Sequence, residues 1–122
     1  MGLHLPGDVA RGVAGCMPTV SLGRAFVLLW DLLNHDFPQG CVFHKRLLPM
    51  LNFLMQSVEM LIACEKLLLV QRGIIRTGYC REPAFHLDRF QLEELASHAG
   101  AFPEMLPHYV RIANSEVNHG VR

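Results

Sequence analysis

Positive charge is in short supply in this sequence, and so is charge in general. Eleven lysine and arginine residues balance eleven aspartate and glutamate residues, and only 18% of the 122 residues are charged. Nucleic acids and anionic membranes attract proteins through a positive field, so the neutral composition argues against both as the main partner. Because 51% of the residues are apolar, the composition is that of a folded chain, long enough for one compact domain.

The sequence also lacks the cysteine patterns of zinc-binding and disulfide-rich proteins. No two cysteines form a Cys-x-x-Cys pair. The first residues show neither the basic nor the apolar stretch of a secretory signal. We therefore expect reduced thiols and a cytoplasmic location. The cysteines are Cys16, Cys41, Cys64 and Cys80.

Long uncharged hydrophobic runs are absent as well. A transmembrane helix needs ~20 consecutive, mostly uncharged residues. The most apolar window, residues 47–70, contains Glu59, Glu65 and Lys66. Each Asp, Lys or Arg at the centre of a span costs about 2.5–3.5 kcal/mol on insertion scales. The sequence therefore predicts no membrane span.

Catalytic and cofactor-binding motifs are missing too. The sequence has no nucleophile elbow, phosphate-binding loop or dinucleotide fingerprint, so we expect no enzymatic activity and no cofactor. One group of residues leaves a metal site open, although only Cys41 and His44 have a spacing typical of zinc ligands, and a polar turn is the alternative. The group comprises His35, Asp36, Cys41 and His44, to which Cys80 and His86 could add a ligand.

One apolar segment dominates what is present. Polar or small side chains recur at spacings of four and three residues from Asn52 to Val70, which places them on one narrow stripe of a helix. Proline is tolerated near a first turn, so Pro49 sets the helix start near Arg46. Gly78 suits the position that ends a helix. We predict one long helix over residues 46–77.

Almost every side chain off that stripe is apolar, and a helix apolar over most of its circumference must be surrounded. Three shorter helices cover only part of it, so we expect a homodimer or another protein to cover the rest. A well-covered core helix in a monomeric bundle is the alternative. The residues predicted to form this partner or dimer interface are Leu47, Met50, Leu51, Leu54, Met55, Val58, Leu61, Ile62, Glu65 and Leu68.

The remaining segments complete a predicted small all-α bundle around the long helix. Frequent glycine and proline over residues 1–18 indicate a flexible arm. Thr19 or Ser21 caps a first helix that runs to about Asn34. We expect residues 19–117 to form a single helical domain.

Two further helices follow in that domain. Asp88 with Gln91 has the spacing of a capping box, which predicts a helix that ends near Gly100. A last helix spans about 103–117, and residues 118–122 are expected to be frayed.

Residues 92–106 resemble the helix-turn-helix of bacterial transcription regulators, in which a leucine-rich helix, an Ala-Gly turn and a helix with a buried leucine recur. The resemblance implies a DNA-binding regulator built on residues 88–117. Pro107 and the scarcity of basic side chains favour a plain helical hairpin instead. The matching residues are Leu92, Leu95, Ala96, Ala99, Gly100, Pro103 and Leu106.

In size, neutrality and apolar helix, the chain is also similar to small helical bacterial anti-activators, which bind a transcription factor and block its dimerisation or DNA contact. The resemblance implies a non-enzymatic regulatory protein that binds its partner through the apolar helical surface. Two alternatives stay open. One is the helix-turn-helix regulator, and the other is a secretion or assembly chaperone, which would share the exposed apolar helix.

Overall fold

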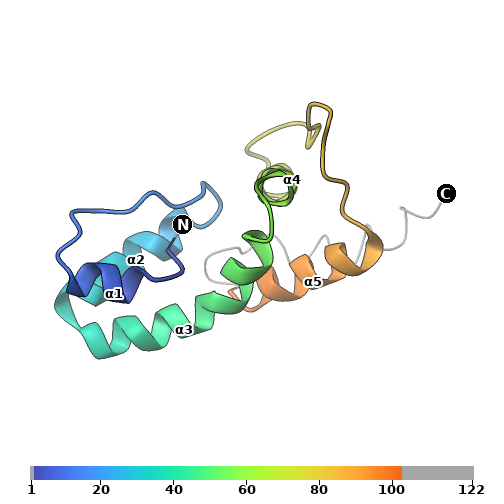
Figure 1. The fold of residues 1–122 in the computed structure, drawn as a ribbon. Helices are drawn as coiled ribbons and strands as arrows, with labels where there is room; N and C mark the ends of the chain where they lie inside the picture. Colours follow the sequence, from blue (N-terminus) through green and yellow to red (C-terminus); the bar gives the residue numbers. More distant parts are fainter. Residues whose placement is uncertain (1, 103–122) are drawn as a thin grey trace. The chain divides into compact units, whose positions relative to one another are not determined.

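The computed structural model describes residues 2–102, and these residues confirm the all-α prediction, because they form helices and no strand. The helices are α1 (Leu5–Ala10), α2 (Gly23–His35), α3 (Phe37–Leu54), α4 (Val58–Gln71) and α5 (Arg89–Gly100) (Figure 1). The helix predicted over 103–117 and the predicted tail lie outside the described residues.

The chain divides after Met55 into two compact units. The first unit contains α1, α2 and α3, and the second contains α4 and α5. This division falls inside the single domain predicted over residues 19–117. Helix α1 lies inside the segment predicted to be a flexible arm, and its Leu5 is buried.

The continuous helix predicted over residues 46–77 is wrong, because the chain leaves the helical conformation between α3 and α4. Ser57 has an extended backbone, with φ −153° and ψ 161°, and acts as the N-cap of α4. Its side-chain oxygen accepts a hydrogen bond from the backbone N–H of Met60 at 3.0 Å. This bond satisfies one of the donors that a helix start leaves unpaired, so it stabilises the interruption.

The predicted helix start near Arg46 is also wrong, since α3 begins at Phe37. The Asp36 carboxylate accepts a hydrogen bond from the Gln39 N–H at 3.3 Å. Pro38 occupies the first turn, where a missing N–H removes no intrahelical bond. Pro49 instead lies inside α3 and leaves one hydrogen bond of the helix unmade.

The end of α4 comes earlier than predicted and at a different glycine. Gly73 has a φ of +69°, the left-handed conformation that favours glycine. The Gly73 N–H donates to the Val70 carbonyl at 2.9 Å, and the Ile74 N–H donates to the Leu69 carbonyl at 2.9 Å. These two bonds form a Schellman motif, which terminates α4 well before the predicted Gly78.

The first unit is built on a tight pair of helices. A single residue, Asp36, joins α2 to α3, and its N–H still bonds to the Leu32 carbonyl of α2 at 2.7 Å. Gly40 faces Leu33 so closely that a Cβ added at Gly40 would lie 2.8 Å from the Leu33 backbone nitrogen. The absence of a side chain at Gly40 therefore lets the two helices approach.

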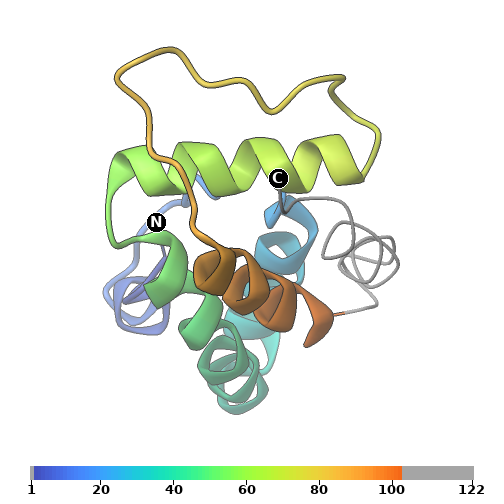
Figure 2. The ribbon, with the colours of Figure 1, turned by 90° about the vertical axis from the view of Figure 1, so that its right-hand side faces the viewer.

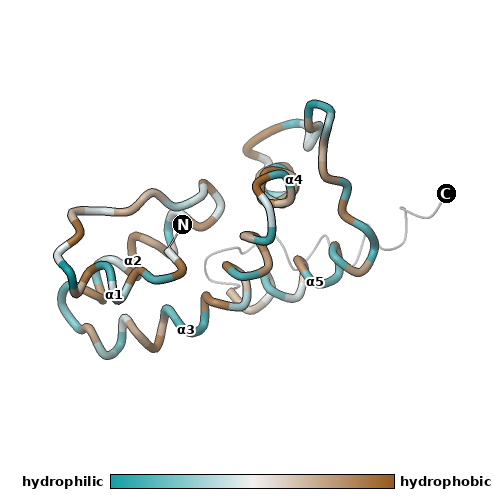
Figure 3. The backbone as a smooth tube through the Cα atoms, in the orientation of Figure 1, coloured by the Kyte–Doolittle hydropathy of each residue, from teal (hydrophilic) through white to brown (hydrophobic). Residues whose placement is uncertain are grey.

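Apolar side chains at helical spacing fill the space that α2 and α3 enclose. The hydropathy alternates along the turns of α3, as expected for a helix with one buried face (Figure 3). Helix α1 contacts both α2 and α3 (Figure 1). The His44 Nε2 atom donates to the Gly2 carbonyl at 2.8 Å and so ties the first residues to α3. The buried apolar side chains of α2 and of α3 as far as Leu47 are Ala25, Phe26, Leu29, Leu33, Phe43 and Leu47.

The helix predicted over residues 19–34 is confirmed in outline as α2. Its N-cap is Leu22, which makes no side-chain capping bond, so the prediction that Thr19 or Ser21 caps it is wrong. The capping box predicted for α5 is confirmed. The Gln91 N–H donates to the Asp88 carboxylate at 2.8 Å, and the Asp88 N–H donates to the Gln91 amide oxygen at 3.0 Å.

Candidate interaction surface

The ten residues of the predicted interface fall into three groups in the structure. Leu47, Met50, Leu51, Leu54 and Leu68 are buried. Leu61 and Glu65 are half-buried, and only Met55, Val58 and Ile62 are exposed. A buried side chain does not reach a partner, so the surface available for binding is smaller than the sequence predicts. The assignment of the ten residues to an interface stays a prediction.

Val58 and Ile62 are the exposed members of that set within the second unit. They are four residues apart on α4, so they lie on one face of the helix. Their exposed fractions are 66% and 45%. Two β-branched apolar side chains therefore meet solvent side by side at the amino-terminal end of α4.

Residues 78–86, here called the return segment, run back along α4 from its carboxyl end (Figure 2). The Lys66 ammonium donates to the Tyr79 carbonyl at 2.6 Å. The Gly78 backbone is close enough to α4 that an added Cβ would lie 3.6 Å from the Leu67 Cδ2 atom. These contacts fix the carboxyl-terminal part of α4 against the start of the return segment.

An open hollow of about 330 Å³ lies between α4 and the return segment. Helix α4 contributes Glu59, Ile62 and Lys66 to its walls. The return segment contributes a cysteine, an arginine and three apolar side chains, which are Cys80, Arg81, Pro83, Ala84 and Phe85. Ile62 belongs both to this lining and to the exposed pair on α4, so the hollow continues the exposed apolar face.

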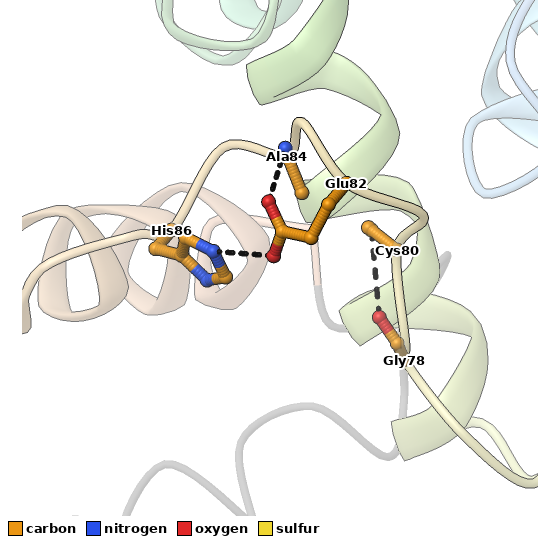
Figure 4. Close-up of polar contacts among 5 residues, drawn as sticks. All are labelled: Gly78, Cys80, Glu82, Ala84 and His86. Carbon is orange, nitrogen blue, oxygen red and sulfur yellow. Dashed lines mark hydrogen bonds and ion pairs between the residues drawn. The ribbon is translucent and has the colours of Figure 1, made fainter.

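A carboxylate in the return segment organises the backbone beside the hollow (Figure 4). The Glu82 carboxylate accepts hydrogen bonds from the Ala84 N–H at 2.9 Å and from the His86 Nε2 at 3.1 Å. The Cys80 thiol donates to the Gly78 carbonyl at 3.5 Å. These local bonds hold a segment that has no helical or sheet hydrogen bonds of its own.

The charges around the hollow are separated by sign. Glu59 is in the first turn of α4, whereas Lys66 is two turns further along, next to the return segment. Arg81 adds a second positive charge to the lining. Within residues 2–102, neither Glu59 nor Arg81 takes part in an ion pair. Both charges are therefore free to pair with a bound molecule.

Helix α5 presents an aromatic side chain to solvent. Leu95 and Ala99 are buried, but Phe90 is 77% exposed. Phe90 and Glu94 are four residues apart, which places them on one face of the helix. The sequence alone did not indicate that Phe90, Phe85, Arg81 and the charge of Lys66 belong to a surface. The sequence does, however, contain a signal for Phe90. It is an aromatic residue in a helix with a clear capping box, and it does not lie on the face that contains Leu95 and Ala99.

A second hollow, of about 290 Å³, lies in the first unit between α2 and the residues before it. Cys16, Phe26, Val27 and Trp30 are among its lining residues. Burial raises the pKa of the Cys16 thiol above its ordinary value of 9.0. A raised pKa keeps the thiol protonated at neutral pH, which makes Cys16 a poor nucleophile.

The residues that left a metal site open in the sequence are not brought together. In the part of the chain that the structure describes, no three His, Cys, Asp or Glu side chains form a group that could hold a metal ion. His44 is buried and bonded to the Gly2 carbonyl, and His86 is bonded to Glu82. His35 lies 3.1 Å from the Asp31 carboxylate on its own helix. Cys41 and Cys80 are both free thiols.

The helix-turn-helix resemblance is covered only in part by the described residues. Its first helix is α5, in which the matching Leu95 and Ala99 are buried as the motif requires. Leu92, another matching position, is 43% exposed. Pro103, Leu106 and the whole of the second helix lie outside the described residues. DNA binding by this segment stays a prediction.

No helix between residues 2 and 102 is, taken singly, long and apolar enough to cross a membrane. Only α3 and α4 taken together, across the break at Met55–Ser57, have the length and composition of a span. Comparison of the chain with protein-family models, with curated proteins and with solved structures finds no match.

Proposed function

We propose that this chain is a non-enzymatic regulatory protein that binds another protein surface through the exposed face of α4. The observation that carries the proposal is the continuity of Val58 and Ile62 with the open hollow beside them. Exposed apolar side chains next to a concave surface are typical of protein-binding sites. The separated charges of Glu59 and Arg81 would orient a partner on this surface.

The resemblance to small bacterial anti-activators makes a transcription factor the partner to test first. An anti-activator needs an apolar surface that competes with the contacts its target makes to itself or to DNA. The α4 face with its hollow provides such a surface, and the neutral net charge fits a partner bound by packing rather than by a strong field.

The experiment compares two valine substitutions that differ only in their place on the fold. Val58→Asp puts an unpaired carboxylate into the exposed apolar pair of the proposed surface, and we expect at least a tenfold loss of partner capture from native lysate. Asp is well tolerated in a first helical turn, so the fold is retained. Val42→Asp is the matched control, because Val42 is 55% exposed on α3. Equal capture by both variants would contradict the proposal.

A further inference from the structure

The charges that line the hollow on α4 and those on the exposed face of α5 run in opposite order along the two helices. On α4, the negative Glu59 precedes the positive Lys66 by seven residues, or ~10 Å along the helix axis. On α5, the positive Arg89 precedes the negative Glu93 and Glu94 by four and five residues, or ~6–8 Å. If an α5 helix lay beside α4 in the same direction, opposite charges would meet at both ends.

Phe90 supplies an apolar group for the middle of that contact. It follows Arg89 directly on α5 and is 77% exposed. The hollow has apolar walls at Ile62 and Phe85, and its volume of about 330 Å³ accepts an aromatic ring. Burial of an aromatic side chain is one of the largest favourable contributions to interface energetics.

The charged groups of α5 are available for such a contact. Arg89 and Glu93 form an exposed ion pair at 2.8 Å, and the Glu94 carboxylate lies 3.5 Å from the His98 imidazole, which is charged only when it is protonated. Exposed ion pairs of this kind contribute little to stability, so exchanging them for contacts with another molecule costs little. Glu94 shares its face with Phe90 and has the longer of the two contacts, so it is the acid best placed to meet Arg81.

We propose that the molecule bound in the hollow is α5 of a second copy of this chain, so that the protein forms a symmetric dimer. This inference rests on the proposed function, because it uses the surface of α4 that the proposed function assigns to protein binding. The hollow and α5 belong to the same unit, so a two-fold axis makes the contact twice. The lining residues and the exposed residues of α5 are fewer than the ~20–30 a side of a standard interface, so we expect a dissociation constant in the micromolar range.

The test is charge reversal, measured by sedimentation velocity on the full chain. Arg81→Glu and Glu94→Arg should each weaken self-association at least tenfold, because each places like charges together in both contacts. An equimolar mixture of the two variants should associate like the wild type. In the mixed dimer, one contact joins the two reversed side chains and the other joins Arg81 to Glu94, so both contacts pair opposite charges.

Phe90→Ala should also weaken the dimer, whereas Tyr79→Ala should not. Tyr79 is the matched control because it is an aromatic residue of the same unit, 69% exposed and outside the lining of the hollow. Raising the salt to about 1 M, where the Debye length is ~3 Å, should weaken the wild-type dimer, because salt screens the charge pairs across the contact. A purely apolar contact would not weaken in this way. Circular dichroism checks that each variant keeps its helix content.

Three results would overturn the second copy as the occupant: a wild-type chain that stays monomeric, an Arg81→Glu variant that associates like the wild type, or a mixture no better than its components. None of them contradicts the proposed function, which is tested by the capture of a different protein with Val58→Asp. If the wild-type chain is monomeric and Val58→Asp still abolishes capture, the α4 surface binds a different protein and not a second copy.

Discussion

Gly40→Ala should destabilise the first unit, although alanine normally favours a helix. An added Cβ would lie 2.7 Å from the Leu33 Cδ2 atom and 2.8 Å from the Leu33 backbone nitrogen. A rotamer change relieves the first contact but not the second, so α2 and α3 must move apart. Overpacking of this kind costs about 1–3 kcal/mol, against a gain of at most ~1 kcal/mol in helix propensity. We expect a net loss of about 1–2 kcal/mol.

The assay is urea unfolding followed by the fluorescence of Trp30. Trp30 is the single tryptophan of the chain and lies on α2, so its signal reports on the unit that contains Gly40. With an m-value of ~2 kcal/mol/M, in the middle of the usual range for urea, the midpoint should fall by roughly 0.5–1 M. Gly23→Ala on α2, in the same unit, is the control, because an added Cβ meets nothing within 4 Å there. A Gly40→Ala midpoint equal to or above that of the wild type would refute the close approach of the two helices at this residue.

Three further substitutions test the ends and the core of α4. Ser57→Ala removes the acceptor of the Met60 N–H and should cost about 1 kcal/mol in urea unfolding followed by circular dichroism, whereas the exposed Ser97→Ala should cost nothing. Gly73→Ala forces a side chain into the left-handed conformation and should cost about 1–2 kcal/mol, a loss that Gly100→Ala should not show. Burial, and then the Glu65 carboxylate, raise the pKa of Cys64 from its ordinary value of 9.0 to about 12, so the folded chain retains the thiol proton that the unfolded chain loses. The stability from this group is therefore fully present below pH 9.0 and lost as the pH rises toward about 12, and Cys64→Ala should flatten that part of the urea-midpoint profile even if it lowers the midpoint overall.

The parts of the fold that could be predicted from the sequence depend on residues close together along the chain. The capping box of α5 joins Asp88 and Gln91, which lie within one helical turn, so both of its hydrogen bonds are implied by the spacing. The all-α class follows in the same way from apolar side chains at intervals of three and four residues.

The break between α3 and α4 could not be predicted from the helical periodicity, because two successive helices can give the same periodic pattern as one continuous helix. The polar stripe keeps its spacing of four and three residues across Gln56 and Glu59, although the backbone at Ser57 is extended. Pro49 does not mark the start of a helix, as the sequence suggested. The proline in the first turn of α3 is Pro38, and Asp36 provides the N-cap. The N-cap residue Ser57 is a single serine inside a long apolar pattern, and the pattern on both sides of it still fits one helix.

The candidate surface depends on contacts between residues that are distant in the sequence. The Lys66–Tyr79 bond joins residues thirteen positions apart and sets the path of the return segment. No local pattern implies that path, so neither the hollow nor the role of Arg81 could be predicted. An apolar pattern also does not distinguish a face covered by the chain itself, as at Leu54, from one left open, as at Val58.

The interruption at Ser57 changes the argument for a partner. One continuous apolar helix over residues 46–77 would need cover along its whole length, and the sheer amount of apolar surface would then demand association. Two shorter helices, each with its own buried residues, leave much less uncovered, chiefly Val42 on α3 and Val58 and Ile62 on α4. The amount of exposed apolar surface therefore does not require a partner by itself, whereas the position of that surface beside a hollow still favours one. A small apolar face beside a hollow, flanked by the unpaired charges of Glu59 and Arg81, selects a partner by shape and by the order of its charges.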